Sequence, residues 1–265
     1  MIAWEGEGIL LSSRPHGETS AIVEVLTPLQ GRHAGVVRGG ASRKMAATLQ
    51  PGGQVAVRWS ARLEDHIGVF TIEPVRSRAA ILQDRAALAA LQAICGLLRD
   101  VLPEREAHPA LYARTERLLD AMVGGPGWGV RYAYWERDLL AELGFGLDLS
   151  ACAVTGGAEA LAYVSPRTGR AVSVSGAGAW KDRLLPLPAF FTDEKAVPDL
   201  AAAFRLTGHF LKTQVAEALD RPRLLDQRVQ HHRRLRHVVG DRHQPVVEQR
   251  QPVLHAQAAA PLRHR

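Results

Sequence analysis

The chain has 265 residues, of which 46% are hydrophobic and 23% charged, with only two cysteines, Cys95 and Cys152. This composition is typical of globular domains and excludes a largely disordered chain or a disulfide framework. Because no apolar run reaches the roughly eighteen residues of a membrane span and no secretory signal opens the chain, we expect a cytoplasmic protein without a membrane partner.

Five short apolar segments separated by turn residues predict strands in residues 1–78. They cover residues 8–12, 20–26, 33–37, 54–59 and 66–72. In the fourth, Val55, Val57 and Trp59 alternate with polar or small residues, which indicates that Trp59 faces a core. Five short strands suit a small closed barrel, because closure removes exposed strand edges.

A basic, glycine-containing loop, residues 38–44, connects the third and fourth strands. Its glycines would let the backbone approach a phosphate, and Arg38, Arg43 and Lys44 would supply charge. A solvated hairpin loop is the competing interpretation. The barrel context favours phosphate binding by this loop, since small five-stranded barrels bind oligonucleotides through one face and its loops.

From residue 79 to residue 220 the apolar periodicity predicts helices. One ends before Pro103 and carries Cys95 on its apolar stripe, so we expect Cys95 to be a core residue. Others begin near Pro109, around Tyr132 and at Leu200. A β-hairpin is expected near residues 161–174, and the fold class is therefore α+β.

Residues 221–265 differ from the rest of the chain. They hold ten arginines against three acids, whereas the first 220 residues hold 23 basic and 24 acidic residues. They could be a basic disordered arm, or a metal-binding run using His231, His232, His237 and His243. We favour a third hypothesis, an out-of-frame translation, because arginine, histidine, glutamine and proline rise abruptly while aromatic residues and periodicity disappear.

In its order of motifs the chain resembles the RecO family of bacterial recombination mediators. No single motif is diagnostic, but their order and spacing over roughly 215 residues make the match specific. The matching pieces are Gly8-Ile9-Leu10-Leu11-Ser12, Leu26-Thr27 with Gly31, Arg38-Gly39 with Ser42-Arg43, Leu49-Gln50-Pro51-Gly52, Glu136-Arg137-Asp138-Leu139-Leu140 with Gly144-Phe145, Tyr163-Val164-Ser165-Pro166 with Gly169, and Leu206-Thr207-Gly208-His209-Phe210-Leu211.

This resemblance implies an N-terminal OB-fold barrel followed by an α-helical domain, and a protein that is not an enzyme. It implies binding of single- and double-stranded DNA, strand annealing, and association with the nucleoid. The implied partners are RecR, the C-terminal tail of the single-strand-binding protein SSB and, as a further candidate, RecF. The implied function is to help load recombinase onto SSB-coated DNA.

The family's zinc site is expected to be lost. Some members hold zinc with four cysteines around the hairpin, whereas here Cys152 stands alone, with Thr155 at the position of its C-x-x-C partner. One thiol cannot hold structural zinc, so we expect no cofactor.

We nominate a set of cations on the barrel as candidates for binding the phosphates of DNA. Aromatic rings, wherever they are exposed, would add to the affinity by stacking on bases. They are Arg14, Arg32, Arg38, Arg43, Lys44 and Arg58. For the SSB tail, which needs a cation beside an apolar groove, Arg131 and Arg137 flank the face of Tyr132, Trp135 and Leu139. Ordinary surface charge is the alternative for all of them.

Two other functions compete with the mediator. One is a generic single-stranded nucleic-acid-binding OB adaptor. The other, less favoured, is a metal-dependent nuclease, which would need clustered carboxylates or histidines. The histidines before residue 220 lie scattered, and Glu64-Asp65-His66 indicates a turn more than a site.

Overall fold

The computed structural model describes residues 1–63 and 65–219, so the predictions for residues 221–265 lie outside the described residues. Five strands form a closed barrel in the order β1-β2-β3-β5-β4. They are β1 (Ile2–His16), β2 (Ser20–Thr27), β3 (Gly31–Val37), β4 (Gln54–Ala61) and β5 (Val69–Arg76). All pairs are antiparallel except β3 with β5, which run parallel at Val36 and Val69 and close the barrel. The α+β fold with an OB-type barrel is confirmed.

The barrel is filled by the inward residues that the alternation predicts. Val55, Val57 and Trp59 are all buried, and Trp59 is 2% exposed, so its predicted place in the core is confirmed. At Gly35 a Cβ atom would lie 2.3 Å from the ring of Phe70, which explains why glycine occupies an inward position of β3.

β1 is longer than predicted because its two halves serve different neighbours. Residues 2–9 pair with β4 and residues 9–16 pair with β2, with a break in register between Leu10 and Ser12. Inward residues of β1 such as Leu10 fill the barrel, while Ile9 and Leu11 pack outward against helices. β5 begins three residues later than predicted, at Val69.

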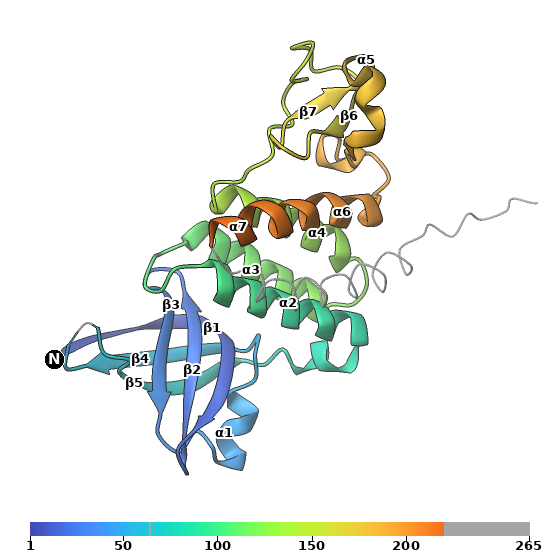
Figure 1. The fold of residues 1–265 in the computed structure, drawn as a ribbon. Coiled ribbons are helices and arrows are strands. Elements are labelled where there is room, and N and C mark those ends of the chain that lie inside the picture. The colour runs from blue at the N-terminus through green and yellow to red at the C-terminus, as the bar shows by residue number, and fades with distance from the viewer. Residues whose placement is uncertain (64, 220–265) are drawn as a thin grey trace, which may run out of the picture.

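The predicted basic loop is shorter than expected, because Arg43 and Lys44 belong to a helix. In α1 (Arg43–Thr48), the Ser42 side chain caps the N-terminus by accepting a hydrogen bond from the amide of Met45. Met45 and Leu49 pack against the barrel core, so α1 covers one end of the barrel. Figure 1 shows α1 at the end of the barrel remote from the other helices.

Beyond the barrel lies a helical domain, which contains a 3-10 helix, η1 (Ala79–Gln83), α2 (Arg85–Val101), α3 (Pro109–Val123), α4 (Trp128–Glu142) and α6 (Leu200–Phe210). The last helix continues as a π-helical turn, η4 (Leu211–Val215), and α7 (Ala216–Ala218). The predicted first helix is divided at Asp84, whose carboxylate caps α2 by accepting from the amides of Ala86 and Ala87. Cys95 is 4% exposed, as expected of a core residue.

The predicted hairpin is present and has a third strand. β6 (Leu161–Val164) pairs with β7 (Ala171–Ser173) and with β8 (Leu185–Pro186). Together with α5 (Val174–Ala177) and a 3-10 helix, η2 (Gly178–Arg183), these strands form what we call the hairpin unit. It projects from the helical domain at the end opposite the barrel (Figure 1). A short helix, η3 (Ala189–Phe191), leads back to α6.

Charged side chains join the barrel to the helices. Glu24 on β2 accepts hydrogen bonds at 2.8 Å from both Arg32 on β3 and Arg99 on α2. Arg78, 3% exposed, donates to Asp120 on α3 and to the carbonyl of Gly52.

Among the described residues, no helix has the length and apolar character that a membrane crossing requires.

Candidate nucleic-acid interface

Four of the nine basic residues of the barrel are engaged in ion pairs. Arg76 and Arg78 both pair with Asp120 of the helical domain. Arg32 pairs with Glu24 and also donates to the carbonyl of Leu102. Arg32 therefore holds the two domains together, and we leave it out of the interface proposed below.

Arg58 lies apart from the other nominated cations. It is exposed on β4 and pairs with Glu5 on β1 at 3.2 Å. A shallow cavity of about 370 Å³ over this part of the sheet is lined by Arg58 and by three carboxylates, Glu5, Glu7 and Glu73. Because this face is acidic overall, it would repel a phosphate backbone, so Arg58 also leaves the candidate set.

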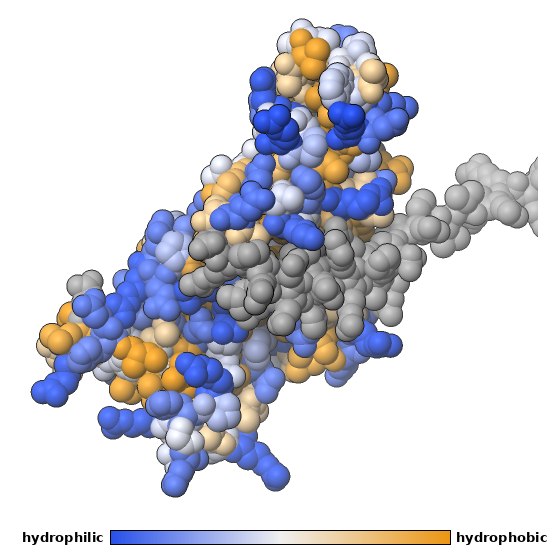
Figure 2. Space-filling model, in the orientation of Figure 1, coloured by the Kyte–Doolittle hydropathy of each residue, from blue (hydrophilic) through white to orange (hydrophobic). Residues whose placement is uncertain are grey.

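The remaining five cations are exposed, and no ion pair involving them occurs within residues 1–63 and 65–219. Arg14 lies near the end of β1, Arg38 directly follows β3 and Arg62 directly follows β4, while Arg43 and Lys44 begin α1. Figure 2 shows hydrophilic side chains projecting from the barrel. The set consists of Arg14, Arg38, Arg43, Lys44 and Arg62.

Two of these arginines line an open groove of about 760 Å³, which we call the basic groove. Arg38 enters it from the end of β3 and Arg62 from the β4–β5 loop, together with His16 and His66. No carboxylate is among the described residues that line it, although Asp65 lies in the same loop. Sequence reasoning did not nominate Arg62 or the two histidines, because their proximity depends on how the strands close.

Strand register connects Arg14 to the basic groove. Arg14 stands opposite Ile22 on β2, and Ile22 stands opposite Val36 on β3, which lines the groove. Arg14 also shares its face of β1 with His16, two residues away. The outer surface of three strands thus carries Arg14 beside the groove.

The loop between β3 and α1 brings Arg43 and Lys44 to the same end of the barrel. The amide of Ala41 donates to the carbonyl of Thr19 at 3.0 Å, which holds the loop against the β1–β2 turn. Gly39 has a positive φ of 70°, a conformation that glycine adopts without strain. One carboxylate, Glu18, lies in that turn, so the five cations face few opposing charges.

The barrel presents no exposed aromatic ring among its described residues. Its three aromatic side chains, Trp4, Trp59 and Phe70, pack together, with Trp4 stacked on Trp59 at a ring-centroid distance of 6.0 Å. The expected contribution of base stacking is therefore absent from this surface, and binding there would depend on charge.

The apolar groove expected beside Arg131 and Arg137 is absent, because Tyr132, Trp135 and Leu139 are 2% exposed or less. Their face of α4 is buried in the helical core. Arg131 is exposed, whereas the guanidinium of Arg137 lies 4.8 Å from the ring centroid of Tyr134 and 5.5 Å from that of Phe191. Arg137 also pairs with Asp138 at 2.9 Å, so the surface there combines one exposed cation, Arg131, with a paired arginine and one partly exposed ring, Tyr134.

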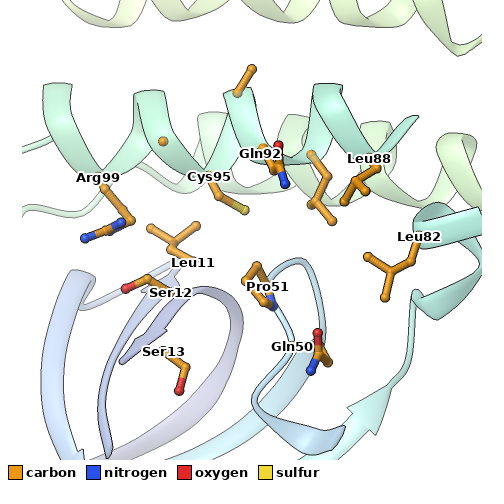
Figure 3. Close-up of a pocket in the computed structure, with 13 residues that line it drawn as sticks. Leu11, Ser12, Ser13, Gln50, Pro51, Leu82, Leu88, Gln92, Cys95 and Arg99 are labelled. Atoms are coloured by element: carbon orange, nitrogen blue, oxygen red, sulfur yellow. The ribbon is translucent and has the colours of Figure 1, made fainter. Parts of the chain in front are cut away.

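A largely apolar cavity of about 530 Å³ lies between β1 and α2 (Figure 3). Leu11 enters it from the barrel and Leu88 and Cys95 from α2, with Arg99 at one end. Burial raises the pKa of Cys95 to about 12, so its thiol is neutral and unreactive at neutral pH. Arg99 already pairs with Glu24, and the cavity offers no acid–base pair for chemistry.

The residues around Cys152 do not fit a zinc ion. Cys152 is 1% exposed, and its sulfur accepts hydrogen bonds from the Ser173 hydroxyl at 3.3 Å and from the amides of Ser173, Val154 and Thr155. A Cβ atom at Gly176 would lie 2.9 Å from this sulfur. Hydrogen-bond donors and a glycine thus surround the thiol, and they supply no further metal ligand. Loss of the zinc remains a prediction.

The hydrogen bonds lower the pKa of Cys152 to about 6, with the Ser173 hydroxyl contributing most and burial opposing the shift. Over residues 1–63 and 65–219, no three histidine, cysteine, aspartate or glutamate side chains are grouped so that they could hold a metal ion.

Comparison with known proteins gives consistent matches over most of the chain. Residues 1–78 match the family model described as Recombination protein O N terminal, and residues 82–222 match Recombination protein O C terminal. DNA repair protein RecO of Dinoroseobacter shibae is 57% identical over 225 residues, which are 84% of this chain and 93% of that protein. DNA repair protein RecO of Roseobacter denitrificans is 58% identical over 219 residues, or 82% and 91% of the two chains.

Proposed function

The chain belongs to the RecO family of DNA repair proteins, and from this premise we propose that it is a recombination mediator. It binds single- and double-stranded DNA, anneals complementary strands, and helps load recombinase onto SSB-coated DNA together with RecR, with RecF as a further candidate partner. It performs these steps by binding, without catalysing a covalent change in the DNA.

The distribution of charge on the barrel supports this proposal most strongly. Its paired cations serve the fold, while Arg14, Arg38, Arg43, Lys44 and Arg62 remain available around the basic groove. The acidic face with Glu5, Glu7 and Glu73 lies over another part of the sheet. A barrel of nearly neutral net charge thus has one surface on which a phosphate backbone would be favoured.

Annealing follows from the same physics. Two complementary strands repel each other through their phosphates, and cations that neutralise these charges lower that repulsion while releasing counterions. A groove without exposed aromatic rings holds the backbone and leaves the base edges free. Bases that are not stacked on protein remain available to pair with a second strand.

The test compares a triple variant, Arg38→Ala/Arg43→Ala/Lys44→Ala, with a matched control, Arg58→Ala. We expect the triple variant to lose single-strand affinity and annealing rate, while the control retains both because Arg58 lies on the acidic face. Affinity would be measured by fluorescence anisotropy and annealing by the pairing of labelled complementary oligonucleotides. Equal affinities for the wild type and the triple variant would remove this loop from the interface.

Contact with the SSB tail is a separate part of the proposal. Arg131 is exposed beside the surface of Tyr134 and Arg137, and its charge could meet the acidic tail and its terminal carboxylate. We expect Arg131→Ala to weaken binding of an SSB tail peptide in a fluorescence titration, whereas Arg117→Ala, an exposed cation on α3, should not. If the two variants bind the peptide equally well, Arg131 is not involved. Displacement of SSB from DNA with no tail contact would favour the generic OB adaptor.

A further inference from the structure

Trp180 differs from every other tryptophan of the chain in its exposure. It lies on η2 of the hairpin unit and is 61% exposed. All five tryptophans are within the described residues, and Trp59, Trp128 and Trp135 are 7% exposed or less, while Trp4 is partly buried. An indole left in water forgoes the large stabilisation that burial of an aromatic side chain provides, so the exposure of Trp180 calls for a reason.

The ring of Trp180 has a cation beside it. The guanidinium carbon of Arg183 lies 5.0 Å from the ring centroid, within the range of a cation–π interaction. Arg183 and Lys181 are both exposed and both belong to the last turn of η2. The arginine thus helps to orient the indole while leaving most of its surface accessible.

Exposed apolar side chains also occur on and against α5, the helix that precedes η2, and η2 itself has few opposing charges. Val174 on α5 is 59% exposed, and Val154, which approaches Gly176 of α5, is 67% exposed. Figure 2 shows hydrophobic side chains among hydrophilic ones at this end of the molecule. Asp182 is the acid within η2, so the turn contributes two cations against one carboxylate.

We propose that Trp180 and Arg183 form a second contact for single-stranded DNA, in which an unpaired base stacks on the indole. Lys181 and Arg183 would then meet the adjoining phosphates. An aromatic face flanked by cations is the combination that binds single strands without sequence preference. It supplies the base stacking that the basic groove lacks. This inference rests on the proposed function and adds a second site to it.

The position of Trp180 gives the contact a role. The hairpin unit and the barrel lie at opposite ends of the molecule, with the helical domain between them (Figure 1). A strand bound at Trp180 therefore leaves the basic groove free to bind another strand. A protein with two such contacts can hold two single-stranded segments at once, which brings complementary strands together for annealing.

Intrinsic fluorescence tests the proposal directly, because Trp180 is the tryptophan most open to quenching. A short oligothymidylate should quench the wild type, and the quenched signal should be missing from Trp180→Phe. The matching duplex should quench little, since its bases are already stacked. The control is Trp128→Phe, which removes a buried tryptophan. In this variant the oligothymidylate should still quench the fluorescence.

Affinity is the second measurement, made in the Arg38→Ala/Arg43→Ala/Lys44→Ala background so that the hairpin contact dominates. Stacking of one base is worth about 1–3 kcal/mol, so Trp180→Ala should weaken binding about 5- to 150-fold. Trp180→Phe, which keeps an aromatic ring, should retain most of the affinity. Adding Lys181→Ala should lower the affinity further at low salt, because a phosphate contact is lost.

The outcomes separate this inference from the proposed function. If the barrel variant loses affinity while the oligothymidylate leaves Trp180 fluorescence unchanged, the second contact is wrong and the first stands. If Trp180→Ala weakens binding but the barrel variant does not, the reverse holds. If purified RecR or SSB quenches Trp180 while the oligothymidylate does not, the surface binds protein and the inference is overturned.

Discussion

The salt dependence of single-strand binding is the most direct quantitative consequence of the five exposed cations. Each phosphate neutralised on a single strand contributes about −0.7 to the slope of log K against log salt concentration. If Arg14, Arg38, Arg43, Lys44 and Arg62 each neutralise one phosphate, the basic groove gives a slope of about −3.5. Arg32 and Arg58 add little, because Glu24 and Glu5 already neutralise them.

Removing three of the five cations leaves two, and the slope should fall to about −1.4. Between 50 and 200 mM salt, binding through the basic groove alone would then weaken roughly 100-fold in the wild type and only roughly 7-fold in the triple variant. The measurement is a titration by fluorescence anisotropy at four or more salt concentrations and at pH 8, where histidine side chains are ordinarily neutral.

Two controls make the comparison specific. Trp180→Phe removes no cation and keeps an aromatic ring beside Lys181 and Arg183, so its slope should match that of the wild type. Arg58→Ala should also leave the slope unchanged. A triple variant with the wild-type slope would refute the assignment of phosphate contacts to this end of the barrel, even if its affinity had fallen.

Three further predictions concern the fold around the sites. Burial favours the neutral form of Glu24, but Arg99, and hydrogen bonds from Arg99, Ser12 and Arg32, outweigh it and hold its pKa below 4.5. Glu24→Gln should therefore lower the free energy of unfolding by about 1.5–3 kcal/mol at pH 7. This difference from the wild type should shrink as the pH falls below 4.5, because the carboxylate becomes protonated. A difference in urea unfolding that stays constant down to pH 3 would contradict this prediction. The pKa of Cys152 lies near 6 rather than 9.0, so its contribution is complete above pH 9 and lost as the pH falls through 6. Cys152→Ala should accordingly cost more stability at pH 8 than at pH 5, as measured by urea unfolding at both pH values. An equal cost at the two pH values would show that the sulfur is bound as a thiol. Gly35→Ala should lower the free energy of unfolding by about 1–3 kcal/mol, because the added methyl group overpacks the barrel against Phe70. In the control, Gly39→Ala, the methyl group meets nothing within 4 Å, so only the strain of the positive φ should lower stability. Equal thermal melting temperatures of the wild type and Gly35→Ala would contradict the predicted clash.

The elements followed from the sequence wherever one local signal dominated. Alternation placed Trp59 in the barrel, and the apolar stripe around Cys95 placed α2 in the helical core. Predicted boundaries shifted where a side-chain cap or a neighbouring strand decided them. Asp84 caps α2 and divides the predicted helix, and Ser42 caps α1 within a segment that reads as loop.

The candidate site was only partly predictable, because charge on a residue says nothing of what stands beside it. Arg32 and Arg38 are both arginines of the same strand region, yet one is bound to Glu24 and Leu102 and the other lies open in the basic groove. Arg62 reaches that groove through pairing of β3 with β5, strands that are far apart in the chain. Similarly, Tyr132 and Trp135 read as a possible groove wall but are enclosed by α6 and its neighbours.

The sequence by itself determined the succession of a five-stranded barrel, helices and a hairpin, the buried faces of most elements and the family resemblance. These depend on residues within a few positions of each other, since the periods of strands and helices are short. Only the tertiary structure decided which cations are neutralised, where the acidic face lies and that Trp180 stays in water. Ion pairs and exposure depend on residues that are distant in the chain. Arg78, for example, pairs with Asp120, 42 residues away, and only the folded tertiary structure brings the two together.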